Sequence, residues 1–355
     1  MPSVLVNGVR LNYVQMAAPD AGGPHEDLVM VHGLATNMAF WYFHYAAVFA
    51  RRYRVTVYDL RGHGRSEMPA GGYTPQNVAR DLEGLLDHLA IARAHFLVHS
   101  FGGVVTLNLA RVAPERIASL VLADTHISAA RGAAGQSWDY GAGIQKLLDE
   151  AGLMLDTRDP YFGYRLLSRV ARMQINHERV PPGLDKLLGP LVANASSKTG
   201  AQWLRLIEST SAEPELMGDD GLSLESLRQM RFPILAMYGD NSQARLTGKE
   251  LLNVWPHAEF RRVRDAGHFF ATSRPAEVIQ ACSRFWRGDF GKVATHRVGE
   301  GDQRHFRSDR VYQGEGGWYC LTREGGPLGP FTSQEDASEQ LDAYISTMGA
   351  LTPAE

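Results

Sequence analysis

The alternation of apolar and polar positions predicts a hairpin followed by a series of short buried strands. Residues 4–15 alternate around Asn7-Gly8, a dipeptide that adopts the positive φ angles of a two-residue hairpin turn. Short apolar runs bounded by loops then recur along the chain, as in strands that are covered on both faces. The predicted strands are Leu28–Val31, Val55–Tyr58, Phe96–Val98, Leu120–Ala123, Ile234–Tyr238 and Phe260–Val263.

Helical segments separate several of these strands. Thr74-Pro75 has the features of an N-cap and a first helical residue, and apolar residues follow at helical spacing. A second helix is predicted from Gly102 to Val112 and must end near Pro114. Alternating strands and helices favour parallel pairing with right-handed crossovers. The expected fold class is therefore α/β, a mostly parallel central sheet flanked by helices.

Residues 126–230 depart from this alternation. Strand signals are missing there, and the segments 161–175 and 201–209 have the pattern of amphipathic helices. Strand signals return at Phe232. We therefore expect a helical lid inserted into the sheet-forming part of the chain.

A different composition begins near Gly291. Residues 310–313 and 318–321 are predicted strands, and a helix is predicted from Ser333 to Ile345. This small β-β-α module could bind a partner through Trp318 and Tyr319, or it could be a structural appendage. The expected domains are a core of residues 1–125 and 231–290, a lid of residues 126–230, and a C-terminal module of residues 291–355.

Composition and charge exclude several classes of protein. Of the 355 residues, 44% are hydrophobic and 21% are charged, which predicts a sizeable core. The 36 basic and 39 acidic side chains give a net charge of −3 without long runs, so no nucleic-acid partner is expected. The two cysteines, Cys282 and Cys320, indicate no disulfide framework, and no signal peptide or membrane span is predicted. We expect a cytoplasmic protein.

Ser100 is the first candidate for chemistry, because it lies between a predicted strand and a predicted helix. A serine hydroxyl becomes an effective nucleophile when a sharp turn exposes it and a base takes its proton. Such a turn favours small residues two positions to either side. Gly102 meets this requirement, whereas Val98 does not. The alternative is a serine that only caps the following helix.

Two further motifs favour the catalytic interpretation. Val31-His32-Gly33-Leu34 follows a predicted strand, and its turn can aim the Leu34 backbone N–H at a developing oxyanion. The Phe101 backbone N–H is the expected second donor. His268 lies in a loop after the last predicted strand of the core, from which it can reach over the sheet to Ser100 as a general base.

Together with the segment Asp59–Ser66, these motifs make residues 1–290 resemble the α/β-hydrolase family. The resemblance implies a serine enzyme without a cofactor or metal, and a mainly structural role for Asp59–Ser66. Dehalogenases and epoxide hydrolases of this fold use aspartate where Ser100 stands. The activity expected first is hydrolysis of an ester or thioester with a small or medium hydrophobic acyl group, and cofactor-free peroxidase and lyase activities are minor options. The alternative is a non-catalytic ligand-binding member with a degenerate triad.

The acid of the triad has two candidates. By the resemblance it is expected after the seventh strand, three residues past a glycine, but Ser242 occupies that position. Asp240 lies two residues earlier. Asp124 directly follows the predicted strand Leu120–Ala123, which we expect beside the Ser100 strand, although an aspartate there can also simply cap a turn. Position favours Asp124, with Asp240 as the alternative acid.

Overall fold

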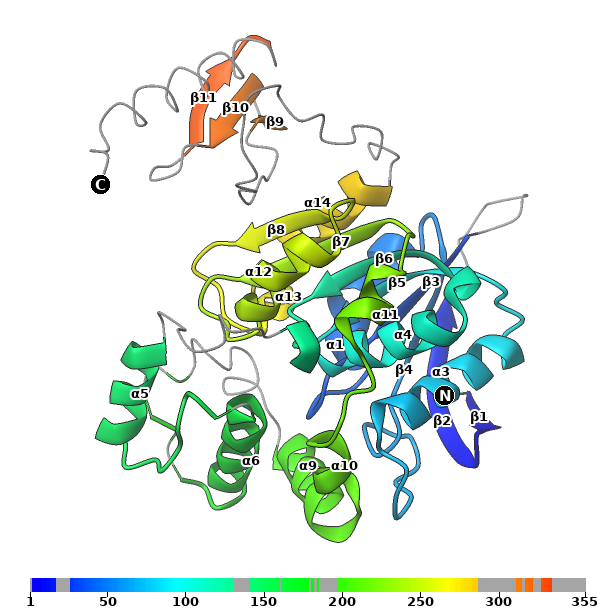
Figure 1. Ribbon diagram of the computed structural model, residues 1–355, viewed down its shortest axis with the longest axis vertical. Coiled ribbons are helices and arrows are strands. Elements are labelled where there is room, and N and C mark those ends of the chain that lie inside the picture. The colour runs from blue at the N-terminus through cyan, green and yellow to red at the C-terminus, as the bar shows by residue number, and fades with distance from the viewer. Residues whose placement is uncertain are drawn as a thin grey trace. The chain divides into compact units, whose positions relative to one another are not determined.

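The computed structural model describes residues 2–16, 26–130, 141–159, 161–178, 180–181, 184, 197–286, 311–314, 317–321 and 327–333. The chain divides into two compact units, residues 1–302 and 303–355. The first contains an eight-stranded sheet flanked by helices, and the second contains a three-stranded sheet (Figure 1). Among the helices that the structure describes, none has the length and apolar character needed to cross a membrane.

The eight-stranded sheet has the order β1-β2-β4-β3-β5-β6-β7-β8. Its first two strands form the predicted antiparallel hairpin, with φ angles of 46° at Asn7 and 71° at Gly8. β2 pairs with β4 in antiparallel fashion, and the pairs from β4 through β8 are parallel. The mostly parallel sheet predicted from the sequence is thus confirmed. The strands are β1 (Ser3–Val6), β2 (Val9–Met16), β3 (Asp27–Val31), β4 (Arg54–Tyr58), β5 (Ala94–His99), β6 (Ile117–Ala123), β7 (Ile234–Gly239) and β8 (Glu259–Val263).

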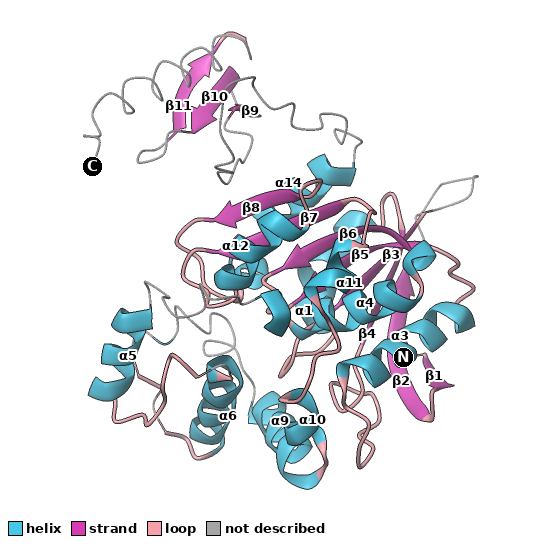
Figure 2. Cartoon of the chain, viewed as in Figure 1, coloured by secondary structure: helices cyan, strands magenta, loops and turns pink. Residues whose placement is uncertain are grey.

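Helices flank the sheet (Figure 2). α3 begins where the sequence predicts, because Thr74 Oγ1 accepts a hydrogen bond from the Asn77 backbone N–H and Pro75 is the first helical residue. α3 packs against α4, and α11 contacts both α4 and α12. The helices are α1 (Ala39–Trp41), a π-helical turn (Tyr42–Ala46), α2 (Ala47–Phe49), α3 (Pro75–His88), α4 (Phe101–Val112), α11 (Leu224–Arg228), α12 (Arg245–Val254), α13 (Phe270–Ser273) and α14 (Pro275–Trp286), with 3₁₀ turns at Pro114–Arg116 and Ser128–Ala130.

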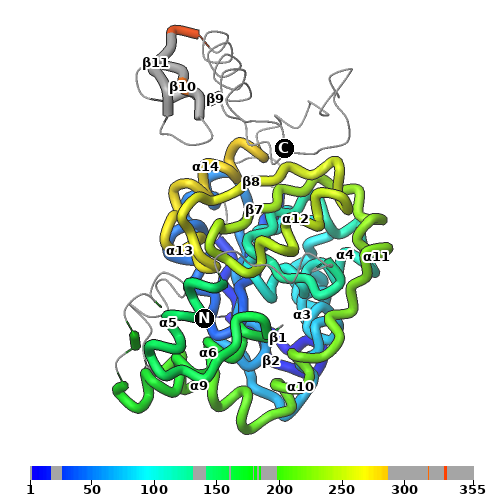
Figure 3. The backbone as a smooth tube through the Cα atoms, turned by 60° about the vertical axis from the view of Figure 1, so that its left-hand side comes forward, coloured from blue at the N-terminus to red at the C-terminus, as the bar shows by residue number. Residues whose placement is uncertain are grey.

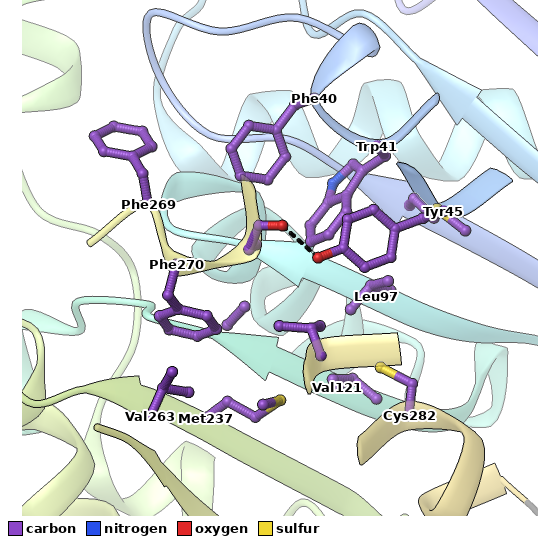
Figure 4. Close-up of a cluster of buried hydrophobic side chains, with 14 of the residues drawn as sticks. Phe40, Trp41, Tyr45, Leu97, Val121, Met237, Val263, Phe269, Phe270 and Cys282 are labelled. Atoms are coloured by element: carbon purple, nitrogen blue, oxygen red, sulfur yellow. Dashed lines mark hydrogen bonds between the residues drawn. The ribbon is translucent and has the colours of Figure 1, made fainter. Parts of the chain in front are cut away.

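A hydrophobic cluster covers one face of the sheet (Figure 4). Side chains from the central strands pack in it against aromatic residues of the segments that follow β3 and β8. The Tyr45 hydroxyl donates a hydrogen bond to the Ala271 carbonyl and so ties these two segments together. Burying each large apolar side chain contributes about 1.5–3 kcal/mol to stability. Residues of this cluster include Phe40, Trp41, Leu97, Val121, Met237, Val263, Phe269 and Phe270.

Five described α-helices lie within residues 126–230, between β6 and β7, and the described residues of this range contain no strand. The last of them, α11, contacts α4 and α12 of the core, and the other four form the insert. Figures 1 and 3 show α5, α6 and α9 set apart from the helices that flank the sheet. α6 packs closely on α9. Two polar side chains fasten this insert to the loop between β4 and α3: Glu215 accepts from the backbone N–H groups of residues 72–74, and Gln202 donates to the Gly62 and Gly64 carbonyls. The helices are α5 (Gly141–Glu150), α6 (Phe162–Ile175), α9 (Ser197–Ser209) and α10 (Ala212–Leu216).

The second unit contains an antiparallel sheet of order β11-β10-β9. The two predicted strands are present as β9 (Val311–Gly314) and β10 (Gly317–Leu321). The third strand, β11 (Pro327–Phe331), was not predicted, because its two prolines and one glycine favour a turn. Proline is tolerated here because β11 is an edge strand of the sheet. The predicted helix lies outside the described residues from position 334 onward.

Candidate active site

Ser100 occupies the sharp turn between β5 and α4. Its φ of 52° and ψ of −122° lie outside the regions that side chains favour, so the turn is strained. Two backbone hydrogen bonds hold it: Ser100 N–H donates to the Ala123 carbonyl at 3.0 Å, and Gly103 N–H donates to the Ser100 carbonyl at 2.9 Å. Val98, which the sequence analysis noted as unusual, is fully buried and does not prevent the turn.

Two glycines allow the loop after β3 to lie directly against this turn. A Cβ atom at Gly33 would lie 2.9 Å from Ser100 Cβ, and one at Gly102 would lie 2.6 Å from the carbonyl oxygens of Val31 and His32. Real Cβ atoms do not approach other atoms so closely, so a side chain at either position would push the loop and α4 apart. The need for a small residue at position 102, inferred from the sequence, has this physical origin.

The two predicted oxyanion donors flank this close approach. Phe101 is the first residue of α4, and the first N–H groups of a helix have no acceptor within it. The Leu34 N–H donates to no backbone carbonyl within the described part of the chain. His32 supports the loop: its Nδ1 donates to the Gly33 carbonyl at 2.8 Å, and its Nε2 accepts from the Leu60 N–H at 3.1 Å. Burial lowers the pKa of His32, which keeps it neutral.

The segment Asp59–Ser66 has a supporting role in the structure. The Asp59 carboxylate accepts hydrogen bonds from Asn12 Nδ2 and from the backbone N–H groups of Met38 and Arg65, at 2.8–2.9 Å. Arg61 forms a buried ion pair with Asp81, with Nη2 and Oδ1 2.5 Å apart. These contacts join the segment after β4 to β2, to the loop after β3 and to α3, and none of them reaches Ser100.

His268 lies between Ser100 and Asp124. Its Nε2 is 3.0 Å from Ser100 Oγ, and its Nδ1 is 2.7 Å from Asp124 Oδ2. Both distances fall in the range expected for a base and its partners. β5 pairs with β6 so that His99 lies opposite Ala123. Ser100 and Asp124 are the next residues of the two strands, so they lie at neighbouring strand ends. Asp124 adopts the left-handed conformation, with a φ of 51°, in the turn after β6.

The Asp124 carboxylate is fully buried and surrounded by donors. The Gly239 N–H donates to Oδ1 at 2.9 Å, and the Ser242 hydroxyl donates to Oδ2. Burying a carboxylate is costly unless hydrogen bonds and an opposite charge compensate for the missing water. Here the loop after β7 provides the hydrogen bonds, and a protonated His268 would provide the charge.

Asp240 lies elsewhere. Its carboxylate forms a two-point ion pair with Arg262 of β8, with Nη2 and Oδ2 2.9 Å apart. Its backbone N–H donates to the Val263 carbonyl at 3.0 Å. Of the two candidate acids, the structure therefore brings Asp124 to His268 and directs Asp240 to an arginine.

His99 packs beneath His268. Its ring stacks on Phe40 with 4.6 Å between centroids, and its centroid is 4.7 Å from that of His268. Because a carbonyl oxygen can only accept, His99 Nε2 must carry the hydrogen that reaches the His268 carbonyl at 3.0 Å. Burial and the neighbouring His268 lower the pKa of His99 well below its ordinary value. His99 is thus a neutral support for the main chain of His268.

Two hydrophobic clusters meet near these groups. One contains Phe40 and Phe269, whose rings contact His99. The other joins the insert helices α6 and α9 to the loop after β3, and Leu34 packs against it. The half-buried Leu167 of α6 contacts both clusters. The insert therefore contributes apolar side chains next to the loop that contains Leu34, the first predicted oxyanion donor.

Among the described residues, no group of three or more histidine, cysteine, aspartate or glutamate side chains is arranged to hold a metal ion. His95, which the sequence places four residues before His99, forms a hydrogen bond to Ser119 Oγ at 2.7 Å. Its surroundings are thus those of a structural histidine.

Residues 28–275 match the family described as the alpha/beta hydrolase fold. The chain belongs to this family. Residues 296–350 match a second family, described as a domain of unknown function (DUF6316). The segment that matches the hydrolase family contains Ser100, Asp124 and His268. The segment that matches the second family covers most of the second compact unit.

Sequence similarity to individual relatives extends over only part of this chain. The 3-oxoadipate enol-lactonase 2 of Acinetobacter baylyi is 36% identical over 145 residues, which are 41% of this chain and 50% of that protein. A dihydrolipoyllysine-residue acetyltransferase component of the acetoin cleaving system of Pseudomonas putida is 40% identical over 117 residues, 33% of this chain and 30% of that protein. The matched segments thus span half or less of the length of these relatives. The esterase RhEst1 from Rhodococcus sp. ECU1013 is 22% identical with a TM-score of 0.58, covers 81% of this chain and 98% of its own, and shows the fold alone.

Two supporting contacts lie beyond what the sequence analysis assigns. The first is that of Ser242, which departs from the family pattern in the sequence and whose hydroxyl donates to Asp124 Oδ2 in the structure. The second is the hydrogen bond from His99 Nε2 to the His268 carbonyl, since His99 is not among the residues expected to have a role in the site. Neither contact could be inferred from the sequence, because each joins residues that are more than 100 positions apart in the chain.

Proposed function

We propose that this member of the alpha/beta hydrolase family is a serine hydrolase that cleaves a carboxylic ester or thioester with a small to medium hydrophobic acyl group. The observation that carries the proposal is the continuous arrangement of Ser100 Oγ, His268 and Asp124, with separations of 3.0 and 2.7 Å. A half-buried hydroxyl on a strained turn, next to a base held by a carboxylate, is what acyl transfer requires. The similarity to an enol-lactonase supports hydrolysis of an ester bond.

In the first half-reaction, Ser100 Oγ attacks the carbonyl carbon while its proton passes to His268 Nε2. Asp124 stabilises the resulting imidazolium through Nδ1. The Leu34 and Phe101 N–H groups donate to the oxyanion of the tetrahedral intermediate. The bond to the leaving alcohol or thiol then breaks, and that group takes the proton from His268. The product of this step is an acyl ester on Ser100.

In the second half-reaction, water replaces the departed group. His268 accepts a proton from the water as it attacks the acyl carbonyl, and the same N–H groups bind the new oxyanion. When this intermediate collapses, the proton returns from His268 to Ser100 Oγ and the carboxylic acid leaves. The hydroxyl and the neutral base are then restored, so the cycle needs no other reactant.

The alternative of a non-catalytic ligand-binding protein rests on the unusual residues Ser242 and Val98. Asp124 weakens the first reason, because it provides the carboxylate that Ser242 lacks. The geometry of Ser100 weakens the second, because the turn is formed with Val98 in place. Both observations favour the enzyme.

Covalent labelling tests the proposal directly. A fluorophosphonate probe should react with the native protein at a single serine, Ser100, and prior unfolding should abolish the reaction because the base and donors are dispersed. Mass spectrometry of the labelled peptide identifies the residue. A native protein that stays unlabelled and hydrolyses no member of a panel of acyl esters and thioesters would support the ligand-binding alternative.

Leu167 should influence which acyl chain is accepted, because it contacts both clusters near the oxyanion loop. We expect Leu167→Trp to lower kcat/KM for an octanoyl ester about tenfold more than for an acetyl ester, and Leu167→Ala to shift the preference toward the longer chain, since one or two methylenes in an apolar pocket are worth ~1–3 kcal/mol. The measurement is kcat/KM along a series of p-nitrophenyl esters.

A control for this experiment is available in the same helix. Ile175 is 37% exposed at the end of α6, so Ile175→Ala removes a comparable side chain without altering the predicted pocket. Its chain-length profile should match that of the wild type. An unchanged profile in both Leu167 variants would place the acyl chain elsewhere.

A further inference from the structure

The Ser242 hydroxyl contacts the same carboxylate oxygen as the base. Ser242 Oγ donates to Asp124 Oδ2, which is also 2.7 Å from His268 Nδ1. The side chain is almost completely buried, with 3% of its surface exposed. Its own oxygen accepts the Ala244 N–H at 3.1 Å. Because this N–H can only donate, the Ser242 hydrogen is left to point at Asp124.

The backbone around Ser242 holds this hydroxyl in place. The Ser242 N–H donates to the Gly239 carbonyl at 3.2 Å, which closes a turn at the end of β7. The Asn241 N–H donates to the Ala266 carbonyl at 3.0 Å. Ala266 lies two residues before His268, so the turn that carries Ser242 is bonded to the loop that carries the base.

We propose that Ser242 is a positioning residue, which fixes the orientation of the Asp124 carboxylate and limits how strongly that carboxylate attracts the protonated form of His268. This inference rests on the proposed serine-hydrolase function. The residue acts through Asp124 and does not contact the substrate.

The direction of the effect follows from hydrogen bonding to a charged group. A donor to a carboxylate stabilises its negative charge and disperses it, so the carboxylate binds a proton or a neighbouring cation less strongly. Removing the Ser242 hydroxyl concentrates the charge of Asp124 on the contact with His268. The imidazolium is then favoured, and His268 becomes a neutral base only at higher pH. The acidic limb of the rate profile therefore moves to higher pH.

Four other titratable groups lie near the pair or in its loops. His99 from β5 stays neutral because burial lowers its pKa. Tyr238 from β7 donates its hydroxyl to the Thr125 carbonyl at 3.0 Å, and burial raises its pKa well above the ordinary value. Arg264 and Asp265, from the loop of His268 itself, are exposed to solvent.

The test compares the pH dependence of kcat/KM in the wild type, Ser242→Ala and Ser242→Thr. Ser242→Ala should move the acidic midpoint upward by about half a pH unit and lower kcat/KM at pH 7 about three- to tenfold. Ser242→Thr keeps a hydroxyl and should restore the wild-type midpoint. Ser119→Ala is the matched control, because it removes a buried hydroxyl from β6 that binds His95 and Trp286 and is remote from Asp124.

The outcomes separate this inference from the function on which it rests. If the wild type shows no Ser100-dependent turnover, the proposed function fails. If the wild type turns over and Ser242→Ala lowers the rate with an unmoved midpoint, Ser242 has only a structural role and the inference is wrong. Should Ser242→Ala not fold, Ser242→Cys replaces it, since a thiol of similar size is a weak donor and must shift the midpoint in the same direction. Labelling rates with the fluorophosphonate probe across pH provide the same midpoint without turnover.

Discussion

Replacing Ser100 with alanine is expected to lower kcat/KM for an activated ester by about 10⁴-fold or more, because no other group can form the acyl intermediate. The oxyanion donors and the substrate-binding surface remain, so a small residual rate above that of water should persist. Stability should change little. Alanine meets the same strain at a φ of 52° as serine does, and the substitution removes only the hydrogen bond between the hydroxyl and His268 Nε2.

Initial rates with p-nitrophenyl acetate and thermal unfolding of the same preparations provide the measurement. Ser119→Ala again serves as the control, because it removes a serine hydroxyl that is buried far from the site. That variant should retain the wild-type rate. A folded Ser100→Ala protein with near-normal turnover would show that Ser100 is not the nucleophile.

The fold was largely predictable because the parallel strands are buried on both faces. Such strands leave continuous apolar runs in the sequence, and every predicted run lies within an observed strand. The ends were less accurate. β6 begins at Ile117, three residues before the predicted start, because Ser119 interrupts the apolar run and finds its partners only in the folded protein, in His95 and Trp286.

The site was predictable where its residues depend on local geometry. Ser100 and Gly102 lie in a turn, and Gly33 lies in the loop that packs against it, so their steric needs can be inferred from a few neighbouring residues. The acid depends instead on which strand ends lie side by side. Asp124 and Asp240 both follow strands and both precede His268 in the chain, so sequence order cannot choose between them. The contacts of Ser242 with Asp124 and of Asp240 with Arg262 arise from tertiary structure and leave no pattern in the sequence.

A second large effect is expected at Asp124. Asp124→Asn should lower kcat/KM by roughly 10⁴-fold, because an amide cannot stabilise the imidazolium and can hold the wrong tautomer of His268. The substitution keeps the shape of a fully buried side chain, and the Gly239 N–H can still donate to the amide oxygen. Circular dichroism and the unfolding temperature establish whether the variant is folded before its rate is interpreted.

Asp240→Asn is the matched comparison, since it makes the same chemical change at the other candidate acid. Asp240 pairs with Arg262, and the two side chains are 11% and 52% exposed, so the substitution removes an ion pair and leaves the contacts of His268 intact. We therefore expect its kcat/KM to stay within about twofold of the wild type. The expected change in rate is small because Asp240 does not bond to Asp124, so the substitution leaves the charge and the hydrogen bonds of Asp124 as they are. If Asp240→Asn instead abolished turnover while Asp124→Asn retained it, with both proteins folded, the acid would have to reach His268 from the end of β7, and the arrangement proposed for catalysis would be wrong.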